Sequence, residues 1–345
     1  MRNLHILFLF LLLVACSEKK EGILVFPKAT ELAAIEYPEE AVMGTPWQIK
    51  PVGDKLLLFF PSSRDENVIK IMDAHTGKIL SSWGIFGNGP GEFFLPQYWG
   101  ADDERMLLYL YDVNTYRFRE YKWSLLQDDL VMEQIAETPF KRDFLKPGRG
   151  ARLENGNFVS AIIYGIEKPV LVMDSQLDSL TIVGDVPDDE HKTITLFDYD
   201  GRLASYGNSF VFAMSSIGYI GFYEQLPDGK IEKRWVHYTE KPVYNGTELN
   251  RKILKDGFGG VAMNDKYIFA TYSGVHDSRE NRQSGQVYPE TILMFDHKGK
   301  LLRNFHTKGK RQTGIAISED GKTLYATVVY PEIEIVRYDI SPYIK

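Results

Sequence analysis

Short apolar runs alternate with polar turns along almost the whole chain. In the first such unit, residues 47–52 lead to a turn at Gly53-Asp54-Lys55, which is followed by the apolar run 56–60 and, after a loop, by residues 68–73. Runs of this length that are bounded by Gly, Asp and Asn are typical of β-strands. The pattern therefore predicts an all-β protein.

The same unit of strands recurs six times. The third strand of each unit is expected to end near residue 73, 122, 174, 224, 296 or 339. Self-similarity with a period of roughly 50 residues, without a helix in every repeat, favours a radial array of sheets over a solenoid. We therefore predict a six-bladed β-propeller of four-stranded blades, formed by residues 29–345.

The sixth repeat is too short to supply its own outer strand, because little of the chain follows Asp339. An open ring would leave unpaired strand edges and a weak seam. We therefore expect an N-terminal strand, around residues 29–37, to close the ring. The fifth repeat carries an insertion, in which we expect a short helix at residues 247–255 and a long polar loop at 275–286.

The first residues are typical of a processed export signal. Arg2 precedes an unbroken apolar run from Ile6 to Ala15, which is too short to span a membrane. The run ends in Leu13-Val14-Ala15-Cys16, which resembles the bacterial lipobox. The resemblance implies a signal peptide at residues 1–15, lipidation of Cys16, and a lipidated tether at 16–28. The acidic residues just after Cys16 fit a surface-export signal no better than a plain solvated linker.

Charge and cysteine content exclude several classes of function. The formal net charge is -7, and no basic stripe is present, which argues against nucleic acid as a partner. Cys16 is the only cysteine, so that its lipidation leaves no thiol for a disulfide, a zinc site or a nucleophile. The sequence also lacks the common catalytic and phosphate-binding motifs. We therefore predict no metal site, no cofactor and no catalytic residues.

One junction between repeats is rich in glycine. Gly84, Gly87, Gly89 and Gly91 are followed by Glu92 and Phe93, and then by a strand ending at Asp112. This stretch resembles an NHL repeat, which implies a six-bladed propeller. Together with the lipobox, the chain resembles the NHL-like and TolB-like propeller lipoproteins of Bacteroidetes. We interpret these residues as structural: the glycines and Glu92 form the turn, Phe93 fills the core between blades, and Asp112 pairs with Arg117.

Propellers usually bind ligands at the mouth of the central channel, which is formed by blade connections and by loops between second and third strands. This architecture suggests the following candidate residues: Arg64, Asn114, Arg117, Arg149, Arg152, Tyr164, His276, Arg279 and Tyr330.

Three hypotheses of function remain. We favour a non-enzymatic propeller that is anchored by lipid in the cell envelope, in the outer membrane, and binds a protein, peptide or glycan there; whether it faces the periplasm or the surface stays open. The second is a hydrolase or lyase similar to the propeller lactonases, with a divalent cation in the channel. The third is a structural scaffold of the envelope. Because one fold serves many functions, the architecture alone does not choose among them.

Overall fold

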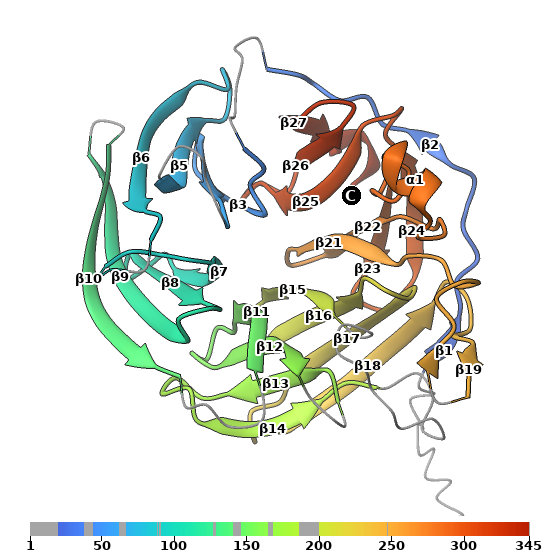
Figure 1. Ribbon diagram of the computed structural model, residues 1–345, viewed down its shortest axis with the longest axis horizontal. Helices are drawn as coiled ribbons and strands as arrows, with labels where there is room; N and C mark the ends of the chain where they lie inside the picture. Colours follow the sequence, from blue (N-terminus) through green and yellow to red (C-terminus); the bar gives the residue numbers. More distant parts are fainter. Residues whose placement is uncertain are drawn as a thin grey trace, which may run out of the picture.

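The computed structural model is a ring of six β-sheets around a central axis, as Figure 1 shows. It describes residues 20–37, 44–61, 67–87, 89, 91–126, 129–140, 146–164, 168–185, 200–246 and 248–344. The predicted six-bladed propeller is therefore confirmed. Within each blade the strands follow one another in antiparallel order from the channel outward.

The first three blades have four strands each. Their bounds are β3 (Gln48–Val52), β4 (Lys55–Phe59), β5 (Asn67–Asp73) and β6 (Ile79–Ile85) in blade 1; β7 (Pro96–Asp102), β8 (Leu107–Asp112), β9 (Arg117–Leu126) and β10 (Asp129–Pro139) in blade 2; and β11 (Lys146–Arg152), β12 (Phe158–Tyr164), β13 (Val170–Met173) and β14 (Ser179–Val183) in blade 3.

The last three blades contain the rest of the chain. Their bounds are β15 (Gly201–Tyr206), β16 (Ser209–Met214), β17 (Tyr219–Gln225) and β18 (Ile231–Tyr238) in blade 4; β21 (Phe258–Met263), β22 (Tyr267–Tyr272), β23 (Thr291–Asp296) and β24 (Leu301–His306) in blade 5; and β25 (Arg311–Ile317), β26 (Thr323–Tyr330) and β27 (Glu334–Asp339) in blade 6. A 3₁₀ turn, η1 (Ser341–Tyr343), follows β27.

The N-terminal segment runs along the outer edges of blades 4, 5 and 6, where Figure 1 shows it in blue. We call residues 20–37 the N-terminal strap. Its strand β1 (Lys20–Ile23) pairs in parallel with β18, and β2 (Thr30–Glu31) pairs in parallel with β24. Further along, Ile35 forms an antiparallel bridge with Arg337 of β27. The strap thus supplies the outer partner that blade 6 lacks, and it also covers the outer edges of blades 4 and 5, which the sequence pattern does not predict.

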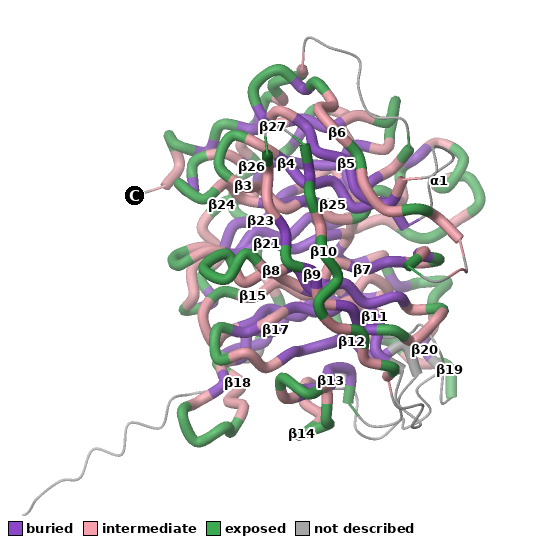
Figure 2. The backbone as a smooth tube through the Cα atoms, turned by 90° about the vertical axis from the view of Figure 1, so that its left-hand side faces the viewer, coloured by how far each residue is buried: buried purple, intermediate pink, exposed green. Residues whose placement is uncertain are grey.

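The hydrophobic core is divided among the six gaps between neighbouring blades. Each gap holds one cluster of buried residues, drawn from the facing sheets of two blades. The cluster between blades 6 and 1, which includes Leu58 and Tyr325, closes the ring. Figure 2 shows how the buried stretches follow the strands. Because β-strands alternate in direction of their side chains, both faces of each blade contribute to this packing.

The insertion in blade 5 differs from the sequence prediction. The sequence predicts a helix at residues 247–255, because Leu249 and Ile253 are four residues apart and would share one helix face. The structure has instead a small hairpin of β19 (Tyr244–Asn245) and β20 (Glu248–Leu249), followed by a turn. Leu249 and Leu254 are the buried residues, whereas Ile253 is 50% exposed. The helical prediction was wrong because it paired Leu249 with the wrong apolar residue. The helix α1 (Arg279–Gln283) lies instead in the polar loop, where Ser278 caps it.

Candidate binding site in the central channel

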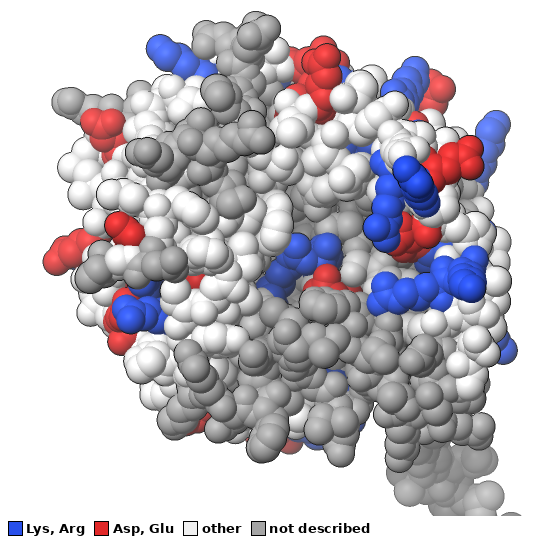
Figure 3. All heavy atoms as spheres, in the orientation of Figure 1, with Lys and Arg blue, Asp and Glu red and all other residues white. Residues whose placement is uncertain are grey.

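The channel of the ring is open and largely formed by the innermost strands. It has a volume of about 1350 Å³ and is lined by residues of β3, β7, β11, β15, β21 and β25. The first residues of these strands lie at the face that carries α1, which we call the α1 face, and the turns after them lie at the opposite face. Figure 3 views the α1 face and shows basic and acidic side chains inside the central hollow.

Arg149 reaches the channel because strand β11 is irregular at this point. The register of β11 with β12 shifts between Pro147 and Gly150, and such a bulge re-aims the side chains beside it. The buried Trp99 of blade 2 fixes the bulge: its indole N–H donates to the carbonyl of Gly148 at 3.0 Å. A Cβ on Gly150 would lie 2.6 Å from the same indole ring. The tight contact with Trp99 therefore holds the backbone that presents Arg149.

Arg149 belongs to a network that crosses the channel. Its guanidinium lies over the ring of Trp47, 5.3 Å from the centroid, and 3.6 Å from the Asp200 carboxylate. Arg202 donates to Asp200 at 3.0 Å and to the carbonyl of Gly259 at 2.8 Å. These contacts link blades 1, 3, 4 and 5. The hydroxyl of Ser215 also donates to the backbone carbonyl of Asp200, at 2.9 Å.

The network carries two positive charges and one negative charge. Burial lowers the pKa of Arg149 to about 9, and the positive charge of Arg202 acts in the same direction. Burial alone would raise the pKa of Asp200, but the two guanidiniums outweigh it and hold that pKa below its ordinary value. Arg149 is therefore the group of this network whose charged form the site destabilises.

A second acidic group lies at the rim of the channel, on the α1 face. Burial raises the pKa of Asp256 to about 6, and the nearby charge of Asp277 adds to the effect. Asp277 itself is paired with Arg282 of α1 through two hydrogen bonds. The side chain of His276 faces the carbonyl of Leu254 at 3.0 Å. The rim thus contains one neutralised ion pair and one carboxyl group that is held partly protonated near neutral pH.

The opposite mouth of the channel is rich in carboxylates. Arg152 pairs with Asp102 at 3.1 Å, and Lys50 pairs with Asp103 at 3.0 Å. Three more carboxylates line this end of the channel: Glu104, Glu154 and Glu319. The channel is therefore polarised, with its arginine pair towards the α1 face and an excess of negative charge at the other end.

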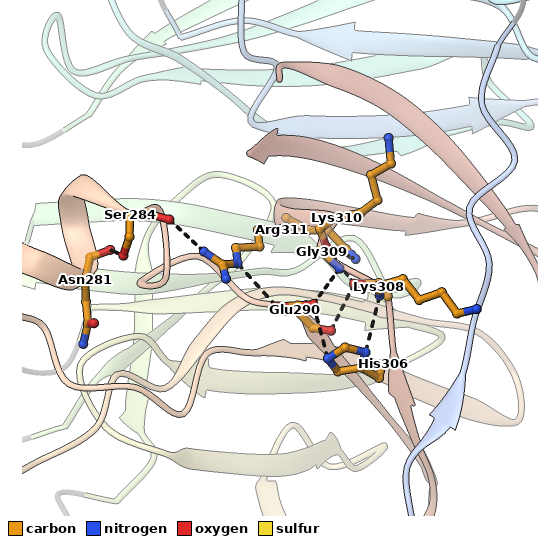
Figure 4. Close-up of polar contacts among 10 residues, drawn as sticks. Asn281, Ser284, Glu290, His306, Lys308, Gly309, Lys310 and Arg311 are labelled. Atoms are coloured by element: carbon orange, nitrogen blue, oxygen red, sulfur yellow. Dashed lines mark hydrogen bonds and ion pairs between the residues drawn. The ribbon is translucent and has the colours of Figure 1, made fainter. Parts of the chain in front are cut away.

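The polar contacts in Figure 4 fix the loop that carries α1. Arg311 at the start of β25 donates to the carbonyl of Ser284 at 2.9 Å, just after the helix, and its Nε lies 3.4 Å from the Glu290 carboxylate. Glu290 also accepts the N–H of Gly309 at 2.5 Å. The guanidinium of Arg311 lies 5.0 Å from the ring centroid of Tyr330. Blade 6 thereby holds the rim loop of blade 5 in place.

Of the seven channel-mouth candidates whose side chains the structure describes, two, Arg149 and Arg152, line the channel. Arg117 points elsewhere and pairs with Glu137 at 2.8 Å, not with Asp112 as expected, and Asn114 lies in an exposed turn. His276, Arg279 and Tyr330 lie in or beside the rim loop. Arg64, the Tyr164 side chain and Cys16 lie outside the described residues.

The glycine-rich junction between blades 1 and 2 is a compact turn. The Glu92 carboxylate accepts the N–H of Gly89 at 2.6 Å, and a Cβ on Gly87 would collide with it. Gly84 and Gly91 have φ values of +82° and +77°, which favour glycine. Phe93 is fully buried in the core between the two blades. This geometry is that of a structural element, and none of its residues lines the channel.

Sequence reasoning missed the partners of Arg149. Trp47 lies just before β3, Arg202 is the second residue of β15 and Arg149 is the fourth residue of β11, so no shared position within a strand signals that they meet. Asp200 is not among the candidates that the sequence predicts. Which of these side chains meet depends on strand bulges and on the closure of the ring, and neither feature is encoded in a local pattern.

The described part of the chain contains neither a cluster of metal-ligating side chains nor a helix that could span a membrane. In the described part of the chain, no group of three or more His, Cys, Asp or Glu side chains is placed to hold a metal ion. Nor does any helix of that part have the length and apolar character needed to cross a membrane.

Comparisons with known proteins support the fold. No protein-family model and no curated protein matches the sequence. Among solved structures, the chain is similar to a Bacteroides fragilis protein whose name proposes that it is exported; the TM-score is 0.61 at 12% identity, over 92% of this chain and 99% of that one. It is also similar to a Lactobacillus plantarum protein, with a TM-score of 0.51 at 13% identity, over 83% and 78% of the two chains. At such identities the likeness shows the fold alone.

Proposed function

We propose that this chain is an interaction module of the cell envelope that binds a protein, peptide or glycan at the α1 face. The observation that carries the proposal is the concentration of non-repeating elements on one face of the ring. The β19–β20 hairpin, α1 and the Arg149–Asp200–Arg202 network all lie on this face. Loops held by a rigid scaffold are where binding functions concentrate.

Export and lipid anchoring are part of the same proposal. The tetrapeptide ending at Cys16 has the form of a lipobox, and the Bacteroides fragilis protein of similar fold carries a name that proposes export. The resemblance to NHL-like and TolB-like propeller lipoproteins supports the same location, with Cys16 anchoring the ring in the outer membrane. Lipid chains on one cysteine provide stable attachment when more than one chain is present.

The charges in the channel argue against the alternative of a lactonase-like hydrolase. Such an enzyme would hold a divalent cation with oxygen ligands on the axis. Towards the α1 face, the described channel instead places Arg149 and Arg202 with Asp200 between them, and this local excess of positive charge repels a cation at that end. A scaffold role remains the competing outcome of the binding test.

The binding face is tested by photocrosslinking in living cells. A photoreactive amino acid replaces Arg279, which is exposed on α1, or Asp320, which is exposed in a turn at the opposite face. We expect crosslinked species of defined mass from position 279 and none from position 320. Equal crosslinking from both faces, or its absence from position 279, would refute the α1 face as the interaction surface.

The anchor is tested separately. Cys16→Ala is expected to abolish incorporation of radiolabelled fatty acid and to release the protein from the membrane fraction, whereas Ser17→Ala is expected to change neither. Labelling that persists in Cys16→Ala would show that the lipobox assignment is wrong.

A further inference from the structure

The guanidinium of Arg149 lacks the hydrogen bonds that a half-buried arginine normally makes. Its side chain is 23% exposed, and the Asp200 carboxylate lies 3.6 Å away, beyond hydrogen-bond distance. Its other described contact is the face of Trp47, which accepts no conventional hydrogen bond. No hydrogen bond joins the guanidinium to any other described residue. A guanidinium has five N–H donors, so Arg149 can donate to a ligand in the channel that it lines.

Arg202 already uses the available carboxylate. It donates to Asp200 and to the Gly259 carbonyl, and its side chain is 20% exposed. Among the described residues, Asp200 therefore balances one of the two guanidiniums and leaves one positive charge uncompensated. Arg282, the other arginine that lines this mouth, is already paired with Asp277. Burial lowers the pKa of Arg149, and the positive charge of Arg202 adds to the effect, whereas Asp200 only partly opposes it.

We propose that Arg149 and Arg202 together bind a single carboxylate group of a ligand that enters the channel from the α1 face. A carboxylate is planar and matches the fork of a guanidinium, and its one negative charge completes the balance. A phosphate monoester would bring nearly two charges and would be repelled by Asp200. The inference rests on the proposed function, because it makes the same channel mouth the place of recognition.

The surroundings of the two arginines favour this direction of approach. At the opposite mouth, Glu104, Glu154 and Glu319 repel an anion, whereas the α1-face mouth leads directly to Arg149. Trp47 is 39% exposed and offers an aromatic surface beside the charged group. Such a surface suits the apolar part of a small ligand, such as the CH groups of a sugar ring or a peptide side chain.

Two common sources supply a carboxylate of this kind: a uronic acid in a glycan and the C-terminus of a peptide. The test uses one probe from each source, D-glucuronate and N-acetyl-alanyl-alanine, with uncharged counterparts D-glucose and the amidated dipeptide. Binding to the full-length protein in detergent is measured by isothermal titration calorimetry and by the shift in thermal unfolding midpoint. We expect at least one acid to bind and to raise the midpoint, and its uncharged counterpart to do neither.

Variants locate the site. Arg149→Met and Arg202→Met are each expected to weaken the binding at least tenfold, as the loss of a charge-assisted hydrogen bond implies. Arg117→Met, which removes an arginine outside the channel lining, is the matched control and is expected to leave binding unchanged. In the absence of a probe, Arg149→Met is expected to keep or raise the unfolding midpoint, because it removes a poorly compensated charge. Arg149→Gln serves as a second variant should the apolar substitution disturb the fold.

The outcomes separate this inference from the proposed function. If neither acid binds the wild-type protein, or if Arg149→Met binds it as tightly as the wild type, the carboxylate site is refuted. The proposed function would still stand if position 279 continued to crosslink to a partner. If the crosslinks also vanished, both proposals would fail.

Discussion

Replacing the buried carboxylate of Asp112 should clearly lower the free energy of unfolding of the ring. Its side chain is fully buried at the junction of blades 1 and 2. One carboxylate oxygen accepts the N–H of Phe94 at 2.7 Å, and the other accepts those of Leu95, Asn114 and Thr115 at 3.4, 3.1 and 3.1 Å. A single side chain thus satisfies four backbone donors from two connecting loops.

Asp112→Asn isolates the contribution of one oxygen and of the charge. The amide can keep one oxygen towards Leu95, Asn114 and Thr115, but its NH₂ group then faces the N–H of Phe94, so that two donors oppose each other. Losing a hydrogen bond to a charged group costs roughly 1.5–3 kcal/mol, and a buried unsatisfied donor adds about 1–3 kcal/mol. We therefore expect a loss of about 3–4 kcal/mol in the free energy of unfolding.

This loss is measurable as a shift in the unfolding midpoint. With an unfolding entropy of about 2.1 cal/mol/K per residue, a domain of roughly 300 residues loses about 5 °C for that change. Differential scanning calorimetry measures it, with Asp296→Asn as the control. Asp296 accepts only the N–H groups of Lys298 and Lys300, through one oxygen, in a surface turn. A shift for Asp112→Asn no larger than that of the control would refute the assigned role of the buried carboxylate.

Three further predictions concern other parts of the ring. The folded state raises the pKa of Asp256 from 3.8 to about 6, so that it binds more protons than the unfolded state. The free energy of unfolding should therefore fall by about 1–2 kcal/mol, after solvent screening, as pH rises from about 4 to 7. Asp256→Asn should remove this pH dependence in urea titrations, and an unchanged dependence would contradict the assignment. Gly150→Ala should cost about 1–3 kcal/mol by overpacking against Trp99, and a neutral result in urea unfolding would show that the bulge adapts freely. Leu32→Ala, at a strap residue that is 3% exposed, should lower the free energy of unfolding by about 2–4 kcal/mol. Val25→Ala, at a strap residue that is 87% exposed, should leave it almost unchanged. Equal effects in calorimetry would mean that the contact of Leu32 with the core does not hold the strap.

The strands could be predicted from the sequence because their signals are local. Alternating apolar residues and Asp- or Gly-containing turns mark each strand, and the third strands of blades 1, 5 and 6 end at the predicted residues 73, 296 and 339. The local pattern around residues 124–137 fits either a helix or an irregular fourth strand, and in the structure this region is the long strand β10 with the end of β9. Here the edge of a completed sheet, not the local sequence, decides the structure.

The candidate site was less predictable because it is made by tertiary closure. Arg149 was found from its place near a blade connection, but Arg202 and Asp200 were not, since their meeting depends on the bulge in β11 and on the packing of blades 3 and 4. Strand β1 was missed for a similar reason: its short parallel pairing with β18 exists only once the outer edge of blade 4 has formed. Sequence patterns record strands well, but not which edges and side chains come together.

The N-terminal strap also imposes an order on folding. Its partners β18, β24 and β27 all lie in the second half of the chain, and the contact between the Pro27 carbonyl and Asn304 joins residues 277 positions apart. The residues that are synthesised first are therefore among the last to reach their native positions. Contacts between such distant residues slow folding, and open strand edges invite aggregation in the meantime. The ring can consequently complete its assembly only after β27 has been synthesised, and pairing of the strap with the outer strands is among the last steps.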